Sequence, residues 1–221
     1  MSRARLAIVA LAIICGGGPS WPPVAAAQQD RGRRLFPPEE LGVLEGADRD
    51  AWQKPDLIMD ALRIGEGSAV ADVGAGGGWF TVRLAKRVGP NGKVYAEDIQ
   101  PEMLAAIRRR VLREGFSNVL YVKGETADPG LPTDTLDAVL IVDAYHEIPN
   151  PVNWLQRLGA SLKPTGRIGI VGFTLEGGGP GPPLNQRVDA QKVIDEAAQA
   201  GLRLVSRETF LDFEYFLILG R

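Results

Sequence analysis

The sequence has little of what several common protein functions require. It contains one cysteine, Cys15, and one histidine, His146, among 221 residues. A single cysteine cannot form an intrachain disulfide. Lys and Arg number 25 against 27 Asp and Glu, so no excess of positive charge is present to attract a phosphate backbone. We therefore expect no nucleic-acid partner, and the 45% hydrophobic content predicts a soluble globular domain.

The sequence also lacks an apolar run long enough to span a bilayer. A basic start, Met1 to Arg5, precedes an apolar run at 6–15, and the small residues Ala25 to Ala27 come before Gln28. This order is typical of a secretory signal peptide at 1–27, cleaved after Ala27. The mature chain then has no cysteine, which excludes thiol chemistry and a cysteinyl metal site, and we expect no metal.

This interpretation predicts an exported protein, periplasmic or secreted, with no membrane span after cleavage. Three alternatives remain open: an uncleaved signal anchor, a lipid anchor on Cys15, and a misassigned start codon, which would make the protein cytoplasmic. The segment before Cys15, Ala12-Ile13-Ile14, lacks the small residue that lipid processing prefers.

After the signal peptide, residues 28–50 form a polar, proline-broken arm, and residues 51–221 alternate between strand and helix patterns. Alternating elements predict an α/β fold: a Rossmann-like doubly wound sheet of seven strands, mostly parallel, with an antiparallel C-terminal hairpin and helices on both faces. Strands are expected at 68–73, 93–97, 118–122, 136–142, 167–173, 202–210 and 213–219, with a turn at 163–166. Helices are expected from Pro55 to a stop at Gly65 and at 79–88, 101–113, 150–162 and 189–200.

A glycine-rich loop carries the first functional signal. Gly74 to Gly78 directly follow the first strand and open the next helix, where backbone can approach a ligand and the helix dipole favours an anion. Glu97 and Asp98 end the second strand, where a nucleotide ribose binds in such folds. Because neighbouring residues on a strand point in opposite directions, we expect one of these two acids to face the ligand. The loop lacks the last glycine of the dinucleotide fingerprint, whose place Trp79 takes.

With this pattern, the chain resembles the class I S-adenosylmethionine-dependent methyltransferases from about Asp50 to the C-terminus. Residues 70–78 resemble their first motif, residues 94–104 their second, and residues 162–167 the turn before their fifth strand. The closing hairpin is similar to their reversed seventh strand. The resemblance implies S-adenosylmethionine as the cofactor.

By position, the resemblance also implies a set of cofactor-binding residues. Asp72 would hold the amino group, Asp98 the ribose hydroxyls, and Glu125 the adenine amine, with Asp128 as an alternative to Glu125. Asp143 is a further candidate for cofactor contact. The other candidates come from the same loops: Gly74, Ala75, Gly76 and Gly78 around the methionine moiety, and Ile99 and Thr126 beside the nucleoside.

Candidate catalytic residues follow the fourth strand, at the edge of the sheet where such sites form. They are Asp143, Tyr145 and His146. A neutral His146 could accept a proton from the acceptor, or it could only begin a helix. Asp143 could orient the nucleophile, and Tyr145 could shape the pocket. Asp143-Ala144-Tyr145-His146 departs from the Asn/Asp-Pro-Pro-Tyr motif of amino-methylating DNA and glutamine enzymes, which disfavours those substrates.

The leading hypothesis is thus a methyltransferase acting on an oxygen or nitrogen of a small-molecule acceptor. The alternatives are an exported non-catalytic binding protein on the same fold and a nicotinamide-dependent oxidoreductase. The arm and the turn-rich loop at 174–185 are expected to form the acceptor pocket. The segment Arg49 to Pro55, which resembles the segment before the core in related methyltransferase-like proteins, could fold over the cofactor, or its Trp52 could only pack. The basic stretch Arg108 to Arg110 with Arg113 is expected to form a solvated helix face.

Overall fold

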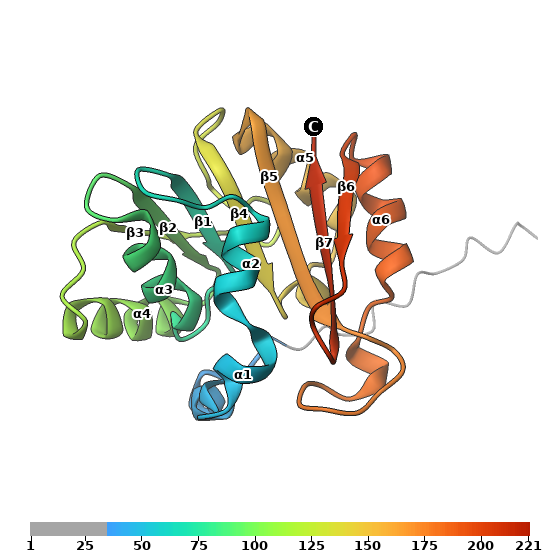
Figure 1. The fold of residues 1–221 in the computed structure, drawn as a ribbon, viewed down its shortest axis with the longest axis horizontal. Helices are drawn as coiled ribbons and strands as arrows, with labels where there is room; N and C mark the ends of the chain where they lie inside the picture. The colour runs from blue at the N-terminus through green and yellow to red at the C-terminus, as the bar shows by residue number, and fades with distance from the viewer. Residues whose placement is uncertain (1–34) are drawn as a thin grey trace, which may run out of the picture. The chain divides into compact units, whose positions relative to one another are not determined.

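The computed structural model describes residues 35–221, which fold around one seven-stranded sheet (Figure 1). The proposed signal peptide at 1–27 lies outside the described residues. The strand order is β3-β2-β1-β4-β5-β7-β6. The predicted fold class is therefore confirmed. None of the helices within residues 35–221 has the length and apolar character needed to cross a membrane.

Five parallel strands are followed by an antiparallel pair. β1 (Ala69–Val73) pairs with β2 (Lys93–Asp98) on one side and with β4 (Leu136–Val142) on the other. The chain therefore builds outward from β1 to β3 (Val119–Lys123) and then returns to the opposite side of β1. This reversal makes the carboxyl ends of β1 and β4 the switch point at which ligands bind in open α/β sheets. The remaining strands are β5 (Leu162–Phe173), β6 (Arg203–Glu208) and β7 (Glu214–Gly220).

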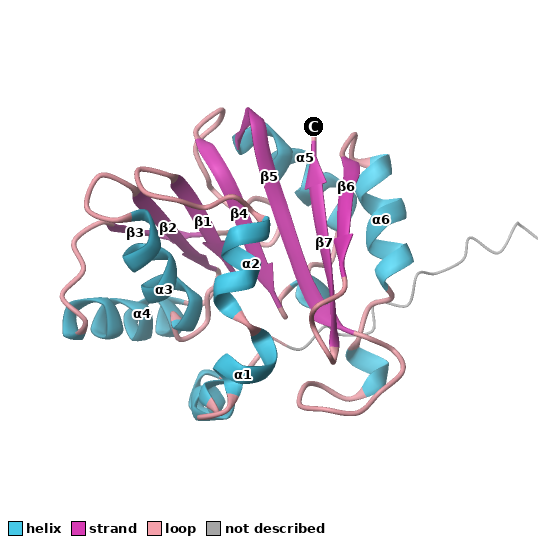
Figure 2. Ribbon diagram, viewed as in Figure 1, coloured by secondary structure: helices cyan, strands magenta, loops and turns pink. Residues whose placement is uncertain are grey.

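Helices cover both faces of the sheet, as Figure 2 shows. On each strand, alternate side chains enter the two cores: Val70 packs on the side of α2, and Ala71 on the side of α5. The helices of the first face are α2 (Pro55–Ala61), α3 (Trp79–Val88) and α4 (Pro101–Arg113). Those of the second face are α5 (Pro151–Ser161) and α6 (Ala190–Gln199), the latter capped by the Asp189 carboxylate.

The start of β5 differs from the prediction. A turn was expected at 163–166, but the strand already begins at Leu162, which is fully buried and pairs with Leu136. The next pair is Ala138 with Arg167, so β5 holds the extra residues as a bulge. Residues 163–166 thus have the composition of a turn, yet they lie within β5. The reason is that Leu162 is buried and pairs with Leu136, so strand pairing continues on both sides of the bulge. The strand predicted at 202–210 is likewise shorter, since β6 covers Arg203–Glu208.

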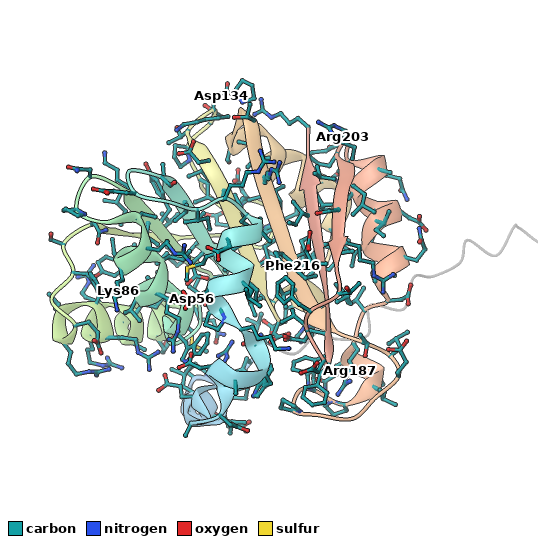
Figure 3. All side chains as sticks on the ribbon, in the orientation of Figure 1. Asp56, Lys86, Asp134, Arg187, Arg203 and Phe216 are labelled. Atoms are coloured by element: carbon teal, nitrogen blue, oxygen red, sulfur yellow. The ribbon has the colours of Figure 1, made fainter. Side chains whose placement is uncertain are left out.

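Phe216 anchors the first core. Phe216, labelled in Figure 3, is fully buried and packs in the cluster that includes Ile58 of α2 and Leu62, which directly follows this helix. Its ring also lies edge-on to that of Phe210. Because α2 precedes β1 in the chain and packs beside a strand near the C-terminus, this contact joins the two ends of the domain.

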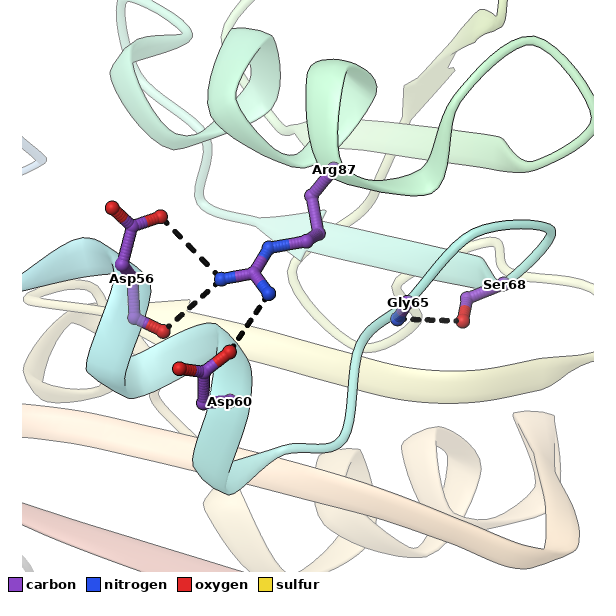
Figure 4. A network of polar contacts seen from close by, with 5 residues as sticks. All are labelled: Asp56, Asp60, Gly65, Ser68 and Arg87. Atoms are coloured by element: carbon purple, nitrogen blue, oxygen red, sulfur yellow. Dashed lines mark hydrogen bonds and ion pairs between the residues drawn. The ribbon is translucent and has the colours of Figure 1, made fainter.

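Arg87 connects α3 to α2 at the surface (Figure 4). Its guanidinium donates to Asp60 Oδ1 at 2.7 Å and to Asp56 Oδ1 at 3.4 Å. The Gly65 N–H donates to Ser68 Oγ at 3.1 Å and closes the turn before β1. Exposed ion pairs of this kind contribute about 1 kcal/mol or less, so packing holds α2 more than charge does.

Two short elements lie before α2 in the chain: the 3₁₀ helix η1 (Pro38–Glu45) and α1 (Arg49–Gln53). Figure 1 shows α1 at the end of the sheet to which the arrowheads of the parallel strands point. The segment between β5 and α6 lies at the same end, where Figure 3 labels Arg187. The predicted arm and loop therefore share the edge that carries the candidate site.

Candidate functional site

The glycine loop forms the centre of the site. Gly74, Gly76 and Gly78 have φ values of 65°, 54° and 79°, a region that side chains disfavour. A Cβ on Gly74 would overlap the Cβ of Ala144, and a Cβ on Gly78 would press on Ile107. The loop therefore needs glycine both for its backbone conformation and for its close approach to the segment after β4.

Both acids at the end of β2 reach this loop. The Gly74 N–H donates to Glu97 Oε2 at 3.2 Å, and the Gly76 N–H donates to Asp98 Oδ2 at 3.0 Å. Asp98 Oδ1 also accepts from the Gln100 N–H at 2.9 Å. We expected one acid to face the site, but the loop wraps over the strand end and bonds with both.

Burial changes the protonation of these acids. Removal from water raises the pKa of Glu97 to about 8, and the neighbouring Asp98 adds to this rise. The pKa of Asp98 is also raised by burial, although backbone donors favour its charged form. A Cβ at Gly124 would overlap the Glu97 carboxyl group, so Glu97 fills the space between the loop and the segment after β3.

Asp72 lies just before the loop and is 3% exposed. Its Oδ2 accepts a hydrogen bond from the Thr81 hydroxyl of α3 at 2.6 Å, and burial raises its pKa to about 6. The structure thus places Asp72 at the predicted position and ties its carboxyl group to the helix that follows the loop.

A cavity of about 440 Å³ lies beside the ends of β2 and β3. This volume is within the range of small-molecule sites. Asp128 lies apart from the lining, because its carboxylate accepts from the Gly130 N–H and pairs with Arg157. Of the two candidate adenine contacts, Glu125 lines this cavity and Asp128 does not. The lining consists of Ile99, Lys123, Gly124, Glu125, Thr126 and Ala127, which include three predicted cofactor residues.

The three predicted catalytic residues meet around a second, smaller cavity. Asp143, Tyr145 and His146 all line it, with Phe173, Arg187 and Tyr215 among the other walls. Its volume is about 10 Å³, roughly the room for one water. The cavity therefore has no room for a molecule larger than water.

His146 and Tyr145 belong to the short 3₁₀ helix η2 (Tyr145–Glu147). His146 Nε2 lies 3.9 Å from Glu147 Oε1. The Tyr145 hydroxyl donates to Glu196 Oε2 of α6 at 2.7 Å, which fixes the ring in the cavity wall. This position agrees with a role of Tyr145 in shaping the pocket.

The turn-rich segment after β5 closes the small cavity. Arg187 donates to the carbonyl oxygens of Pro182 and Thr174, both at 2.9 Å, and its guanidinium lies 5.1 Å from the Phe173 ring centre. Arg187 thus holds both ends of this loop against the cavity wall.

The described part of the N-terminal arm, residues 35–50, packs against the glycine loop. The Phe36 N–H donates to Glu147 Oε1 at 3.1 Å, and Gln100 Nε2 donates to the Phe36 carbonyl at 3.0 Å. A Cβ at Gly77 would meet Leu41 and Glu45 of η1. Glu45 also pairs with Arg110, so one arginine of the 108–110 run contacts the arm and is half-buried.

Helix α1 belongs to the segment Arg49 to Pro55, which the sequence analysis expected either to fold over the cofactor or to pack, without a separate role for Arg49 or Gln53. Arg49 lies 4.3 Å from the Trp79 ring centre, and Gln53 Nε2 donates to Glu214 Oε1 at 2.8 Å. The Trp52 ring packs on Phe173 with centres 6.0 Å apart, which is the packing interpretation. A signal for Glu214 was available: it is an acid at the start of an otherwise apolar strand.

Comparison with known proteins gives a consistent result. A family described as "Methyltransferase domain" matches residues 70–166. A protein-L-isoaspartate O-methyltransferase of Methanococcoides burtonii is 30% identical over 146 residues, 61% of this chain and 71% of that protein. A demethylmenaquinone methyltransferase of Anoxybacillus flavithermus is 30% identical over 118 residues, 53% of this chain. That match spans 49%, about half, of the relative's own length.

A solved structure agrees over most of the chain. The S-adenosylmethionine-dependent methyltransferase of Aquifex aeolicus superposes with a TM-score of 0.79 at 28% identity. The match covers 83% of this chain and 98% of that one. The similarity therefore includes the elements around both cavities as well as the matched family region.

Proposed function

Because this chain belongs to the S-adenosylmethionine-dependent methyltransferases, we propose that it transfers a methyl group to an oxygen or nitrogen atom of a small-molecule acceptor. The observation that supports this most is that predicted site residues line two cavities along the same edge of the sheet, one beside the ends of β2 and β3 and one beside the ends of β4 and β5. One adjoins the predicted nucleoside residues, and the other is lined by the predicted catalytic residues.

The residues present fit the cofactor. The glycine loop carries no side chain larger than the Ala75 methyl group, which lets a ligand approach its backbone closely. Asp98 offers a carboxylate with about four acceptor sites, of which backbone N–H groups use only a part, so acceptor capacity remains for the ribose. The cavity at Glu125 and Thr126 has room for a base. We assign the nucleoside to Asp98, Ile99, Glu125 and Thr126, and the methionine moiety to Asp72, Gly74, Ala75, Gly76 and Gly78.

When bound, the cofactor supplies an electrophilic methyl group on a sulfonium sulfur. The protein then has to orient the acceptor atom in line with this methyl, exclude water and receive a proton. We assign the holding of that proton to Asp143 and His146, because both line the small cavity. The loop that Arg187 holds borders this space and would limit the access of water to it.

Calorimetry tests the cofactor class. S-Adenosylmethionine and S-adenosylhomocysteine are expected to bind the protein purified from Gln28 onward with micromolar affinity, and NAD is expected not to bind. The reason is the absence of the last dinucleotide glycine, at Trp79, together with an intact acid at Asp98. If only NAD bound, or if no nucleotide bound, the proposal would be wrong.

We also propose that the protein is exported and cleaved after Ala27, on the sequence pattern of residues 1–27. Expression of the full chain in a Gram-negative bacterium, followed by fractionation and mass spectrometry, checks this. The expected product is a periplasmic protein that begins at Gln28. An intact chain that begins at Met1 in the cytosol would contradict it.

A further inference from the structure

Two buried carboxyl groups meet at the reacting end of the site. Asp143 directly follows β4, and Glu214 begins β7. Gln53 Nε2 donates to Glu214 Oε1 at 2.8 Å and to Asp143 Oδ2 at 3.4 Å, which draws the two carboxyl groups together. Within residues 35–221, Asp143 Oδ1 and Glu214 Oε2 are buried and find no donor from another group. A proton between the carboxyl groups satisfies both atoms.

The backbone holds Asp143 in this position at a cost. Its φ is 55°, in the left-handed region that residues other than glycine rarely adopt. The Asp143 N–H donates to the Val171 carbonyl of β5 at 3.1 Å, and the next residue, Ala144, abuts Gly74. The pair therefore adjoins the glycine loop, at the switch point of the sheet.

Charged groups on several neighbouring elements act on the Asp143–Glu214 pair. Arg49 of α1 lies on one side, together with Asp72 of β1, and Arg187 lies across the small cavity. Tyr215 of β7 and His146 also face this cavity. Burial raises the pKa of both Asp143 and Glu214, and their mutual repulsion raises that of Glu214 further, whereas Arg49 opposes both shifts.

We propose that Asp143 and Glu214 share one proton, release it when the sulfonium cation of the cofactor binds, and regain a proton from the methyl acceptor. Asp143 is the catalytic member, because it lines the cavity, and Glu214 is a positioning residue that acts through it. This inference rests on the proposed function, which it extends by assigning the proton acceptor.

The step balances in atoms and charge. The lone pair of the acceptor oxygen or nitrogen forms the bond to the methyl carbon, and the bond from that carbon to sulfur breaks with its electron pair going to sulfur. The acceptor's proton moves to the Asp143–Glu214 pair. The site loses the positive charge of the sulfonium and gains that of the proton, so its total charge stays constant in a low-dielectric space.

The test compares the proton release that accompanies the binding of two ligands. Calorimetry in buffers of different ionisation enthalpy measures how many protons leave the protein. S-Adenosylmethionine and S-adenosylhomocysteine share the ribose, base and amino acid, so their difference isolates the sulfonium charge. At neutral pH we expect S-adenosylmethionine to release about one proton more than S-adenosylhomocysteine.

Substitutions test whether the released proton comes from the Asp143–Glu214 pair. Glu214→Gln and Asp143→Asn each keep the shape of the side chain and supply an amide donor to the remaining carboxylate, so both variants are expected to fold. Each should abolish the difference in proton release between the two ligands. Asp137→Asn is the matched control. Asp137 lies near the start of β4, at the end of the strand opposite to Asp143, and pairs there with Lys163.

The outcomes are distinguishable. Equal proton release by both ligands in the unsubstituted protein, or a difference that survives in Glu214→Gln and Asp143→Asn, would overturn the inference and leave the proposed function intact. Failure of S-adenosylmethionine to bind would overturn the proposed function and this inference with it.

Discussion

Replacing Asp98 by asparagine is expected to weaken S-adenosylmethionine binding about 100-fold, since two charge-assisted hydrogen bonds to ribose hydroxyls are lost. Asp98 is 6% exposed, and its carboxylate also receives the N–H groups of Gly76 and Gln100. An asparagine amide would direct a donor at one of these N–H groups and disturb the glycine loop. Calorimetric titration of the cofactor into wild type and variant measures the change.

Two control measurements accompany this prediction. Asp137→Asn removes an acid at the opposite edge of the sheet and should bind the cofactor as tightly as wild type. Circular dichroism of Asp98→Asn should retain the wild-type spectrum at the assay temperature. Retention of wild-type affinity by a folded Asp98→Asn protein would show that the ribose lies elsewhere.

Stability is expected to fall as the pH rises, with Glu97 as a main cause. The pKa of Glu97 is raised from an ordinary 4.5 to about 8, so in this interval the folded protein holds a proton that the unfolded chain has lost. The stabilisation is therefore fully present below the unfolded value and is lost as the pH rises through the folded value. One such proton changes the free energy of unfolding by about 1.4 kcal/mol per pH unit.

Urea denaturation at a series of pH values checks this expectation. Glu97→Gln should flatten the decline and should be more stable than wild type above pH 8, because glutamine accepts the Gly74 N–H and carries no charge to bury. Glu102→Gln, at an exposed position on α4, should leave the wild-type slope unchanged. Parallel curves for wild type and Glu97→Gln would contradict the assignment.

The fold was predictable because its signals are local. Strand and helix patterns alternate along the chain, and helix starts are marked by the N-cap Asp189 of α6 and by the proline at the first position of each of α2, α4 and α5. The bulge in β5 was not predictable, since residues 163–166 carry genuine turn chemistry. Their strand assignment depends on the pairing of Leu162 with Leu136, a contact between distant segments.

The assignment of the cofactor side stays a prediction, and it could be made from the sequence because its residues lie in three short segments, each next to the end of a strand. The acceptor side of the site could not be predicted from the sequence in the same way. Asp143 was a candidate by its position after β4, but its partners Gln53 and Glu214 are far away in sequence and have no motif in common.

The sequence by itself determined the fold class, the methyltransferase family, and the positions of the glycine loop and Asp98. These depend on periodicity, on glycine conformation and on the acid at a strand end, all of which are properties of short segments. Only the tertiary structure decided that both Glu97 and Asp98 bond to the loop and that α1 and β7 bring two carboxyl groups together. The reason is physical: burial and charge proximity arise from segments far apart in the chain, and no short segment encodes them.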